Sequence, residues 1–362
     1  MDSYLKSIKT IIIESLNDYV ILKDSIFHKE GGGQPSDKGW IEKEEILKYD
    51  GTKFYLKNNI FKKNQEVTLS IDWDYRYELM KAHTAEHLLF GSLQKINSSF
   101  EIEKIQLSEN ESKIFVIGEI NQKDLILAQI AANEKIKEDL KIKEEVVKKE
   151  DVTNTRIKID KIKDEKVRII NIGNYDKAAC SGTHLASTKE IEFIIIKDIK
   201  KESSKITQLI FLTGKKAINY AITSCAILTG LSNDLNENPQ KLSQRIISIN
   251  NENLLLKSTI RKLNNALLNS IKFEPVNGII FYEFNGIESE KLIKKASQEA
   301  QNSNVVFIND NTIIIAGKNS ENIFEELKKV FEIKGGGREI KIGKINNFDI
   351  NKIKIALLRL KY

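Results

Sequence analysis

The spacing of apolar residues gives the beginning of the chain the pattern of short strands. Short apolar runs such as Thr10–Glu14 and Tyr19–Lys23 alternate with turn-forming segments, and the region closes on the run EVTLSID. Short apolar runs bounded by turn residues are typical of β-strands. We therefore expect residues 1–72 to form an N-terminal β-barrel or small sheet.

The middle of the chain mixes two periodicities. Tyr75–Lys95 has the spacing of a helix, and strand-like runs follow at Phe115–Glu119, Arg168–Ile172 and Ile191–Ile196. Between them an amphipathic helix is predicted, with an apolar face made by Leu125, Ile126, Ile130 and Ile136. This mixture predicts an α+β domain over residues 73–213.

A heptad seam marks the helical segment 214–272. Its apolar positions step by fours and threes through Leu242, Ile246, Ile249, Asn253, Leu256, Ile260, Leu263 and Leu267. Isoleucine at two of the four a positions, leucine-rich d positions and one asparagine at a favour a two-stranded coiled coil, and hence a homodimer. The alternative is a hairpin in which this helix packs on residues 215–231 of the same chain. The sequence leaves both open.

The last 90 residues predict a separate small α/β domain, residues 273–362. Their pattern reads strand, helix, strand, strand, helix, loop, helix, with KGGGREIKIG as the loop. We thus expect an α+β protein of four parts, bounded at 1–72, 73–213, 214–272 and 273–362.

Composition narrows the class of protein. At 362 residues the chain is longer than one hydrophobic core usually supports, and 41% apolar with 30% charged residues is typical of soluble globular proteins. No apolar run reaches membrane length and the N-terminus lacks a secretion signal, so we expect a cytoplasmic protein. A net charge of +6, from 57 basic and 51 acidic residues, permits nucleic-acid binding without requiring it.

Two matched pairs of residues carry the candidate chemistry. Three of the four histidines and one of the two cysteines fall in His83-Thr-Ala-Glu-His87 and Cys180-Ser-Gly-Thr-His184. Residues four apart share one helix face, so His83 and His87 can bind one ion, and Cys180 and His184 complete a tetrahedron. Mixed nitrogen and sulfur donors favour zinc, one ion per chain.

Other readings of these residues are weaker. An isolated HxxxH is usually a surface feature, but the second pair argues against that. The order H-T-A-E-H differs from the HExxH of metalloproteases, and we expect Glu86 to point away from the metal. Cys225, with apolar neighbours, is expected to be a buried helix residue.

A glycine loop, EGGGQPSDKG, lies in the strand-rich region. Three consecutive glycines, Gly31, Gly32 and Gly33, imply positive φ or a close approach of another group to the backbone. The loop fits neither GxxxxGK[ST] nor GxGxxG, so it is not a phosphate loop. The alternative is a flexible hairpin tip.

Taken in order, these motifs resemble the editing domain of alanyl-tRNA synthetase and its free-standing AlaX relatives. The resemblance rests on EGGGQPSDKG, DWDYRYELMKAHTAEHLL, ANEKIKEDL and IGNYDKAACSGTHLAST. It implies zinc ligands His83, His87, Cys180 and His184, and a substrate pocket lined by Gly31, Gly32, Gly33 and Gln34. The catalytic residues stay unknown, with Gln34, Thr84 and Thr183 as candidates. His28 stands where relatives commonly carry tyrosine, and we expect a polar turn residue there.

The C-terminal part is similar to the DHH-associated RNA-binding domain of the longer AlaX proteins. The match includes GGGR, so Gly335, Gly336, Gly337 and Arg338 are further candidate contacts to RNA. The proline, alanine, glutamine and further glycines that often follow are replaced by EIKIGKI. The catalytic Asp-His-His motif of DHH phosphoesterases is absent.

The resemblance implies a hydrolase that acts in trans, because nothing in the chain resembles an ATP site. Its expected substrate is tRNA(Ala) mischarged with serine or glycine, since a pocket for alanine rejects both poorly. Four protein ligands are typical of a closed zinc site, so zinc is expected to hold the tRNA 3′ end or the substrate amine. Two rivals remain: an editing hydrolase for another tRNA, such as that of threonine, and a tRNA-binding accessory protein with a structural zinc.

Overall fold

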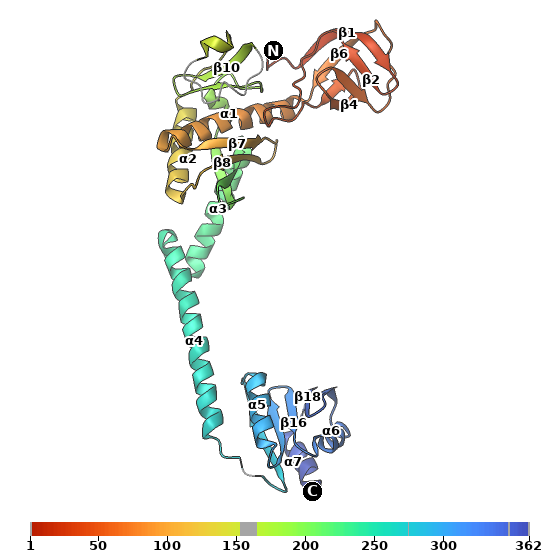
Figure 1. The fold of residues 1–362 in the computed structure, drawn as a ribbon, viewed down its shortest axis with the longest axis vertical. Coiled ribbons are helices and arrows are strands. Elements are labelled where there is room, and N and C mark those ends of the chain that lie inside the picture. The colour runs from red at the N-terminus through yellow and green to blue at the C-terminus, as the bar shows by residue number, and fades with distance from the viewer. Residues whose placement is uncertain (1, 153–164, 274, 347, 361–362) are drawn as a thin grey trace. The chain divides into compact units, whose positions relative to one another are not determined.

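The computed structural model describes residues 2–152, 165–273, 275–346 and 348–360. The chain divides into two compact units, Met1–Asp234 and Leu235–Tyr362 (Figure 1). Within the described ranges no helix has the combined length and apolarity that a membrane crossing requires.

The first unit begins with a closed barrel, as the sequence predicts. Its strands pair in the order β1-β2-β5-β4-β3-β6. Inward side chains, among them Ile12, Val20, Phe54 and Leu69, form one buried core. The strands are β1 (Ser7–Leu16), β2 (Tyr19–Leu22), β3 (Gly39–Ile41), β4 (Glu44–Tyr49), β5 (Lys53–Leu56) and β6 (Glu66–Ile71).

A long buried helix, α1 (Trp73–Ile96), organises the rest of the first unit. In Figure 1 it lies between the sheet β11-β10-β9 and the sheet β12-β13-β8-β7, and one core joins it to both sheets and to α2. The remaining elements are β7 (Glu101–Gln106), β8 (Ser112–Ile117), α2 (Gln122–Lys137), β9 (Ile142–Lys148), η1 (Lys149–Asp151), β10 (Lys166–Ile172), β11 (Asp176–Ala179), η3 (Thr188–Ile191), β12 (Ile194–Lys201), β13 (Ile206–Thr213) and α3 (Gly214–Asp234).

The predicted apolar face of α2 is half wrong. Leu125 and Ile136 are buried, but Ile126 and Ile130 are more than half exposed. The face that packs inward also contains two alanines, Ala128 and Ala132. Alanine contributes little to an apolar pattern, so the prediction followed the two large isoleucines and placed the buried face about one residue position away from the observed one.

The second unit carries α4 and a five-stranded sheet of order β14-β15-β16-β18-β17. Both faces of this sheet are buried, one under α5 and the other under α6 and α7. Its elements are η4 (Pro239–Lys241), α4 (Leu242–Ser270), β14 (Ile279–Phe284), α5 (Ser289–Glu299), β15 (Asn304–Asn309), β16 (Thr312–Ala316), α6 (Ser320–Lys328), β17 (Ile333–Gly336), β18 (Ile340–Ile345) and α7 (Ile350–Arg359).

The segment KGGGREIKIG is a β-hairpin, not the predicted loop. Gly335 pairs with Gly343, and Gly336 with Ile342, across β17 and β18. A Cβ at Gly335 would lie 2.1 Å from the Ile342 carbonyl oxygen. Glycine is therefore required there by the close approach of the two strands. Arg338 is exposed at the turn.

Two features of the long helices bear on the predictions. The seam residues Leu256, Ile260 and Leu263 of α4 are all more than half exposed, so the prediction of a coiled-coil partner stays open, as does the hairpin with residues 215–231.

Cys225 on α3 is exposed, so its predicted burial is wrong. An apolar neighbourhood in sequence does not decide which helix face packs. The four-part division of the chain also stays a prediction.

Candidate metal centre

The first pair of candidate ligands lies on the most buried stretch of α1. The helix begins after Asp72, whose side chain accepts a hydrogen bond from the Tyr75 amide and so caps the N-terminus. His83 and His87 follow one turn apart, both buried, with ring centroids 5.5 Å apart. As the sequence predicts, they present two imidazoles on one face.

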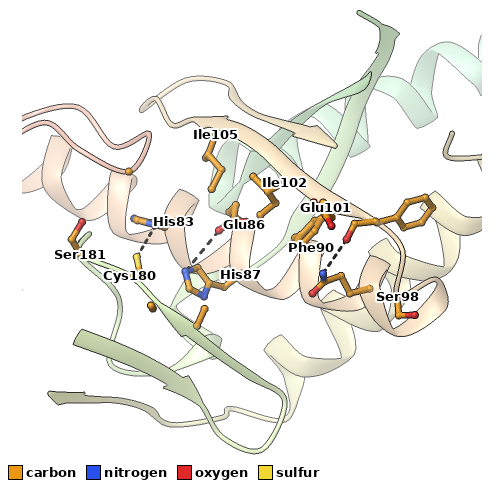
Figure 2. Close-up of a pocket in the computed structure, with 15 residues that line it drawn as sticks. His83, Glu86, His87, Phe90, Ser98, Glu101, Ile102, Ile105, Cys180 and Ser181 are labelled. Atoms are coloured by element: carbon orange, nitrogen blue, oxygen red, sulfur yellow. Dashed lines mark hydrogen bonds and ion pairs between the residues drawn. The ribbon is translucent and has the colours of Figure 1, made fainter. Parts of the chain in front are cut away.

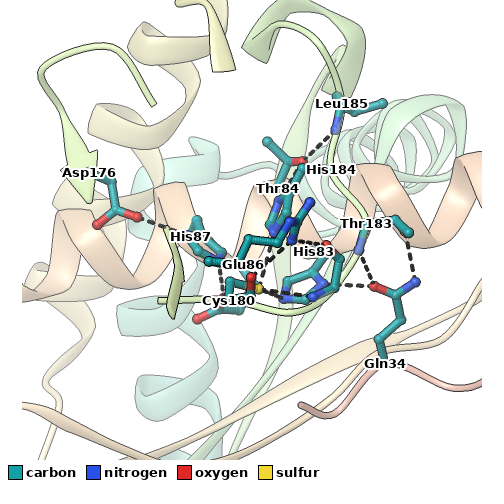
Figure 3. Close-up of polar contacts among 12 residues, drawn as sticks. Gln34, His83, Thr84, Glu86, His87, Asp176, Cys180, Thr183, His184 and Leu185 are labelled. Atoms are coloured by element: carbon teal, nitrogen blue, oxygen red, sulfur yellow. Dashed lines mark hydrogen bonds and ion pairs between the residues drawn. The ribbon is translucent and has the colours of Figure 1, made fainter. Parts of the chain in front are cut away.

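The second pair comes from the loop after β11 and closes onto the first. Cys180 Sγ lies 3.2 Å from His83 Nε2 and 3.2 Å from His184 Nε2 (Figure 3). One donor atom from each of His83, His87, Cys180 and His184 lies within 4.8 Å of the others. The structure thus assembles residues nearly 100 positions apart into a group that could hold a metal ion.

Each imidazole of this cluster has a polar partner at Nδ1. Gln34 Oε1 lies 2.9 Å from Nδ1 of His83, and Asp176 Oδ2 lies 2.9 Å from Nδ1 of His87. Thr84 Oγ1 lies 3.3 Å from Nδ1 of His184. Partners at Nδ1 fix the ring and direct Nε2 toward a metal, an arrangement common to protein metal sites.

Asp176 is a functional residue that sequence reasoning missed. It is buried on β11, four positions before Cys180, and it contacts His87 from a different element. Its only sequence signal is a place in the stretch YDKAAC, because a lone aspartate next to a strand is common. The contact depends on β11 lying beside α1, which the sequence pattern does not indicate.

Gln34 ties the glycine loop to both metal motifs. Its side chain is fully buried, its Oε1 accepts a 3.0 Å hydrogen bond from the Thr183 amide, and its Nε2 donates to Thr183 Oγ1 at 2.8 Å. The Leu185 amide donates to Thr84 Oγ1. Gln34, Thr84 and Thr183, the three candidates from the sequence, therefore all lie beside the cluster and support its loop (Figure 3).

The glycine loop itself is a hydrogen-bonded turn that packs against β7. Gly31 and Gln34 exchange two backbone hydrogen bonds of 3.0 Å, and both central residues, Gly32 and Gly33, have positive φ. Such a turn strongly prefers glycine at both central positions. A Cβ at Gly33 would lie 2.4 Å from the Ile105 carbonyl oxygen, so the loop docks tightly on β7.

A buried ion pair anchors the C-terminal side of this loop to α1. Arg76 Nε donates to Asp37 Oδ1 at 2.6 Å, Nη2 binds Asp37 Oδ2, and Nη2 also donates to the Ile26 carbonyl at 2.8 Å. Both side chains are inaccessible to solvent. The pair therefore fixes where Gln34 meets the metal cluster.

His28, expected as a polar turn residue, is buried beside this pair. Its backbone amide donates to Asp37 Oδ2, and its Nε2 has no hydrogen-bond partner among the described residues. Burial lowers the pKa of His28 to about 4, although the nearby Asp37 opposes the shift. His28 is thus a neutral interior residue.

The electrostatics of the cluster suit metal binding. Burial alone would raise the pKa of the Cys180 thiol, but His83 and His184 hold that pKa well below its usual value. Burial lowers the pKa of His184 to about 3. Thiolate and neutral imidazole are the forms that bind metal ions, so the four residues fit a zinc ion.

Gly182 offers a sharp test of the loop geometry. A Cβ there would lie 2.1 Å from His83 Cε1 and 2.7 Å from Gln34 Oε1. We expect Gly182→Ala to displace His83 or the Cys180 loop and to lower zinc affinity by about 10-fold or more, as loss of ligand support does. Gly31→Ala is the matched control, since a Cβ there meets nothing within 4 Å. Zinc titration against a competing chelator compares them, and equal affinities would contradict this packing.

A cavity of about 440 Å³ adjoins the cluster (Figure 2). His83, His87 and Cys180 form part of its wall, together with Gly32 and the apolar side chains of Phe90, Ile102 and Ile105. Of the glycine-loop candidates, Gly32 alone lines this cavity. The candidate metal ligands therefore border a space large enough for a small ligand.

Glu86 contradicts the expectation that it points away from the metal. It lines the same cavity, and its Oε2 lies 3.8 Å from His87 Nε2 (Figure 2). The expectation used the helical angle alone. A glutamate side chain is long enough to bend from the flank of α1 toward the face occupied by the histidines.

Comparison with known proteins agrees with this geometry. Residues 167–212, which include Cys180 and His184, match the family model described as the threonyl and alanyl tRNA synthetase second additional domain. The chain is 32% identical over 235 residues to the alanyl-tRNA editing protein AlaX-L of Pyrococcus horikoshii, covering 60% of this chain and 58% of that protein.

Longer relatives match almost the whole chain. Identity to an alanine–tRNA ligase of Saccharolobus islandicus is 26%, over 98% of this chain and 42% of the ligase. Identity to the alanine–tRNA ligase of Sulfurisphaera tokodaii is also 26%, over 93% of this chain and 40% of that ligase. The chain thus spans less than two thirds of the length of each relative. By these matches the chain is similar to AlaX-type alanyl-tRNA editing proteins and to part of alanine–tRNA ligases, and the family-model match includes Cys180 and His184 of the histidine and cysteine cluster.

Proposed function

We propose that this protein is a zinc-dependent aminoacyl-tRNA deacylase that hydrolyses tRNA(Ala) mischarged with serine or glycine. The observation that carries the proposal is the group His83, His87, Cys180 and His184, of which the first three line a 440 Å³ cavity. The resemblance of the chain to an alanyl-tRNA editing protein supports the substrate class.

The reaction needs modest catalytic power because an aminoacyl ester is already activated. The oxygen of a water bonds to the ester carbonyl carbon, the carbon–oxygen bond to the ribose breaks, and a proton passes from the water to the ribose oxygen. The products are a free amino acid and uncharged tRNA. Bound zinc supplies Lewis acidity that polarises a carbonyl or water.

The chain's own residues position the reactants. Gln34, Thr84 and Asp176 hold the three imidazoles, and the apolar walls at Phe90, Ile102 and Ile105 exclude bulk water from the ester. The fourth ligand, Cys180, makes the site resemble a closed one. Zinc held by these four side chains would contact the substrate only by accepting a further ligand, and the attacking water would come from the cavity.

Recognition of the tRNA body is assigned to the second unit. The β17–β18 turn exposes Arg338 next to Gly335, Gly336 and Gly337, and glycine lets a nucleic-acid backbone approach closely. Arginine is well suited to phosphate contacts. Arg338 at this turn is our proposed contact to tRNA(Ala).

Hydrolysis of a panel of charged tRNAs tests the function. Seryl-, glycyl- and alanyl-tRNA(Ala) are compared with seryl-tRNA(Thr), each incubated with the protein and assayed for remaining ester. We expect the first two to lose their amino acid and the others to persist. Loss from tRNA(Thr) alone would move the protein to the threonine system, and tight binding of tRNA(Ala) with no hydrolysis would favour an accessory protein.

The exposed seam on α4 predicts a homodimer. We expect the native protein to have twice the mass of one chain, and Leu256→Glu to shift it to the monomer by placing a charge at a d position. Ile247→Glu is the matched control, because Ile247 is also exposed but lies off the seam. Light scattering distinguishes them, and a monomeric wild type would refute the coiled coil.

A further inference from the structure

A buried carboxylate, that of Glu86, faces the cavity and lies outside the group of four residues that could hold a metal ion. The Glu86 side chain lies on α1 and the residue is 1% exposed. Among the described residues its Oε1 has no hydrogen-bond partner. A buried carboxylate oxygen without a donor is costly, so we expect a donor to arrive with the ligand.

Glu86 is not needed to orient His87. The Nδ1 atom of that ring already has Asp176 Oδ2 at 2.9 Å, and the Glu86 carboxylate lies on the Nε2 side, 3.8 Å away. In Figure 2 the carboxylate extends toward His87, and Ile102 of β7 lines the same cavity. It is therefore placed to contact a group bound in the cavity next to the cluster.

The charges around the cavity indicate the sign of that group. Two carboxylates, Glu86 and Glu101, line it, and within the described part of the chain no lysine or arginine does. The remaining wall is largely apolar, including Phe90, Ile102 and Ile105. Apart from the metal cluster, the cavity wall therefore offers negative and no positive side chains, and a small cation is the group that would pair with the Glu86 carboxylate.

We propose that Glu86 binds the α-ammonium group of the aminoacyl ester and so restricts the site to substrates with a free amine. The inference rests on the proposed deacylase function. Every aminoacyl-tRNA carries an ammonium group one carbon away from the ester carbonyl. With that cation on Glu86, the ester carbonyl would face the histidine and cysteine cluster, and the amine would not be a ligand of the metal.

The same contact defines a substrate class. Serine, glycine and alanine share the α-ammonium, so Glu86 does not discriminate among them. An N-acylated amino acid, as in formyl-aminoacyl- or peptidyl-tRNA, lacks the positive charge and adds bulk beside a desolvated carboxylate. We therefore expect the site to reject N-blocked esters.

The test compares free and N-acetylated esters. Hydrolysis of seryl-tRNA(Ala) and N-acetyl-seryl-tRNA(Ala) is measured for wild type, Glu86→Gln and Glu103→Gln. Glu103→Gln is the control because it alters an exposed carboxylate on β7 outside the cavity wall. We expect Glu86→Gln to lower kcat/KM for the free ester by about 10- to 100-fold, the range for a hydrogen bond to a charged group. The N-acetyl ester should react slowly with all three proteins. The ratio of kcat/KM for the free ester to that for the N-acetyl ester should be large for the wild type and close to one for Glu86→Gln.

A binding measurement separates this inference from the deacylase proposal. Adenosine carrying serine through a 3′-amide, and its N-acetyl form, are titrated calorimetrically into the same proteins, with zinc content measured for each. Tighter binding of the free-amine analogue by wild type but not by Glu86→Gln, at equal zinc content, supports the anchor even if no ester is hydrolysed. Equal affinity of the wild type for the two analogues overturns the inference. So does a Glu86→Gln variant that binds both analogues equally weakly and has also lost its zinc. The wild-type comparison decides the matter if the variant fails to fold.

Discussion

Replacing Cys180 with alanine is expected to lower zinc affinity by at least about 100-fold, since four ligands together contribute roughly 10–16 kcal/mol of binding. The thiolate lies 3.2 Å from Nε2 of both His83 and His184, so its loss also removes the negative charge that those rings share. The measurement is zinc affinity from competition with a chromogenic chelator, with metal content determined after gel filtration.

The chain provides its own control for this variant. Cys225 is the other cysteine, exposed on α3, and Cys225→Ala should bind zinc as the wild type does. If Cys180→Ala retained full affinity, the four-ligand site would be wrong. If Cys225→Ala lost zinc equally, the metal would lie elsewhere.

Replacing Arg76 with alanine is expected to cost about 3–5 kcal/mol of unfolding free energy, because it leaves the Asp37 carboxylate buried without its cation. The two side chains are inaccessible to solvent, and Arg76 also binds the carbonyls of Ile26 and Ser3. Urea unfolding followed by circular dichroism measures the change. Because the ion pair anchors the glycine loop, zinc affinity should fall as well.

An exposed ion pair is the matched control. Lys9 pairs with Glu66 at 3.9 Å on the barrel surface, where both side chains are mostly exposed, so Lys9→Ala should change stability little. The double variant Arg76→Met with Asp37→Leu should recover part of the lost stability, since no charge then stays buried, while the His28 amide and the Ile26 carbonyl lose their partners. Equal effects of Arg76→Ala and Lys9→Ala would show that burial does not set the strength of the pair.

The metal centre was predictable from the sequence because its residue types are scarce. Four histidines and two cysteines leave few ways to produce two matched pairs, and α1 and the Gly182 turn then fix their faces. Asp176 and Glu86 were not predictable in the same way. Carboxylates are abundant in this chain, and their roles depend on which side chains bend toward the cluster.

The fold was predictable where periodicity was strong and large side chains marked the core. The barrel and α1 follow the predicted pattern. The α2 face was misplaced because Ala128 and Ala132 pack inward, while the β17–β18 hairpin was hidden by glycines that normally indicate a loop. In both cases small residues lie where two elements pack closely, and a pattern of hydrophobic residues does not reveal such positions.

The central claim is that the histidine and cysteine cluster hydrolyses mischarged tRNA(Ala) only when it holds zinc. The most direct measurement follows seryl-tRNA(Ala) with protein stripped by a strong chelator, then with one equivalent of zinc restored, for wild type, Cys180→Ala and Cys225→Ala. The account predicts hydrolysis by zinc-loaded wild type and Cys225→Ala, and by neither protein when stripped. Cys180→Ala should be inactive at one equivalent of zinc. Undiminished hydrolysis by stripped wild type would contradict it.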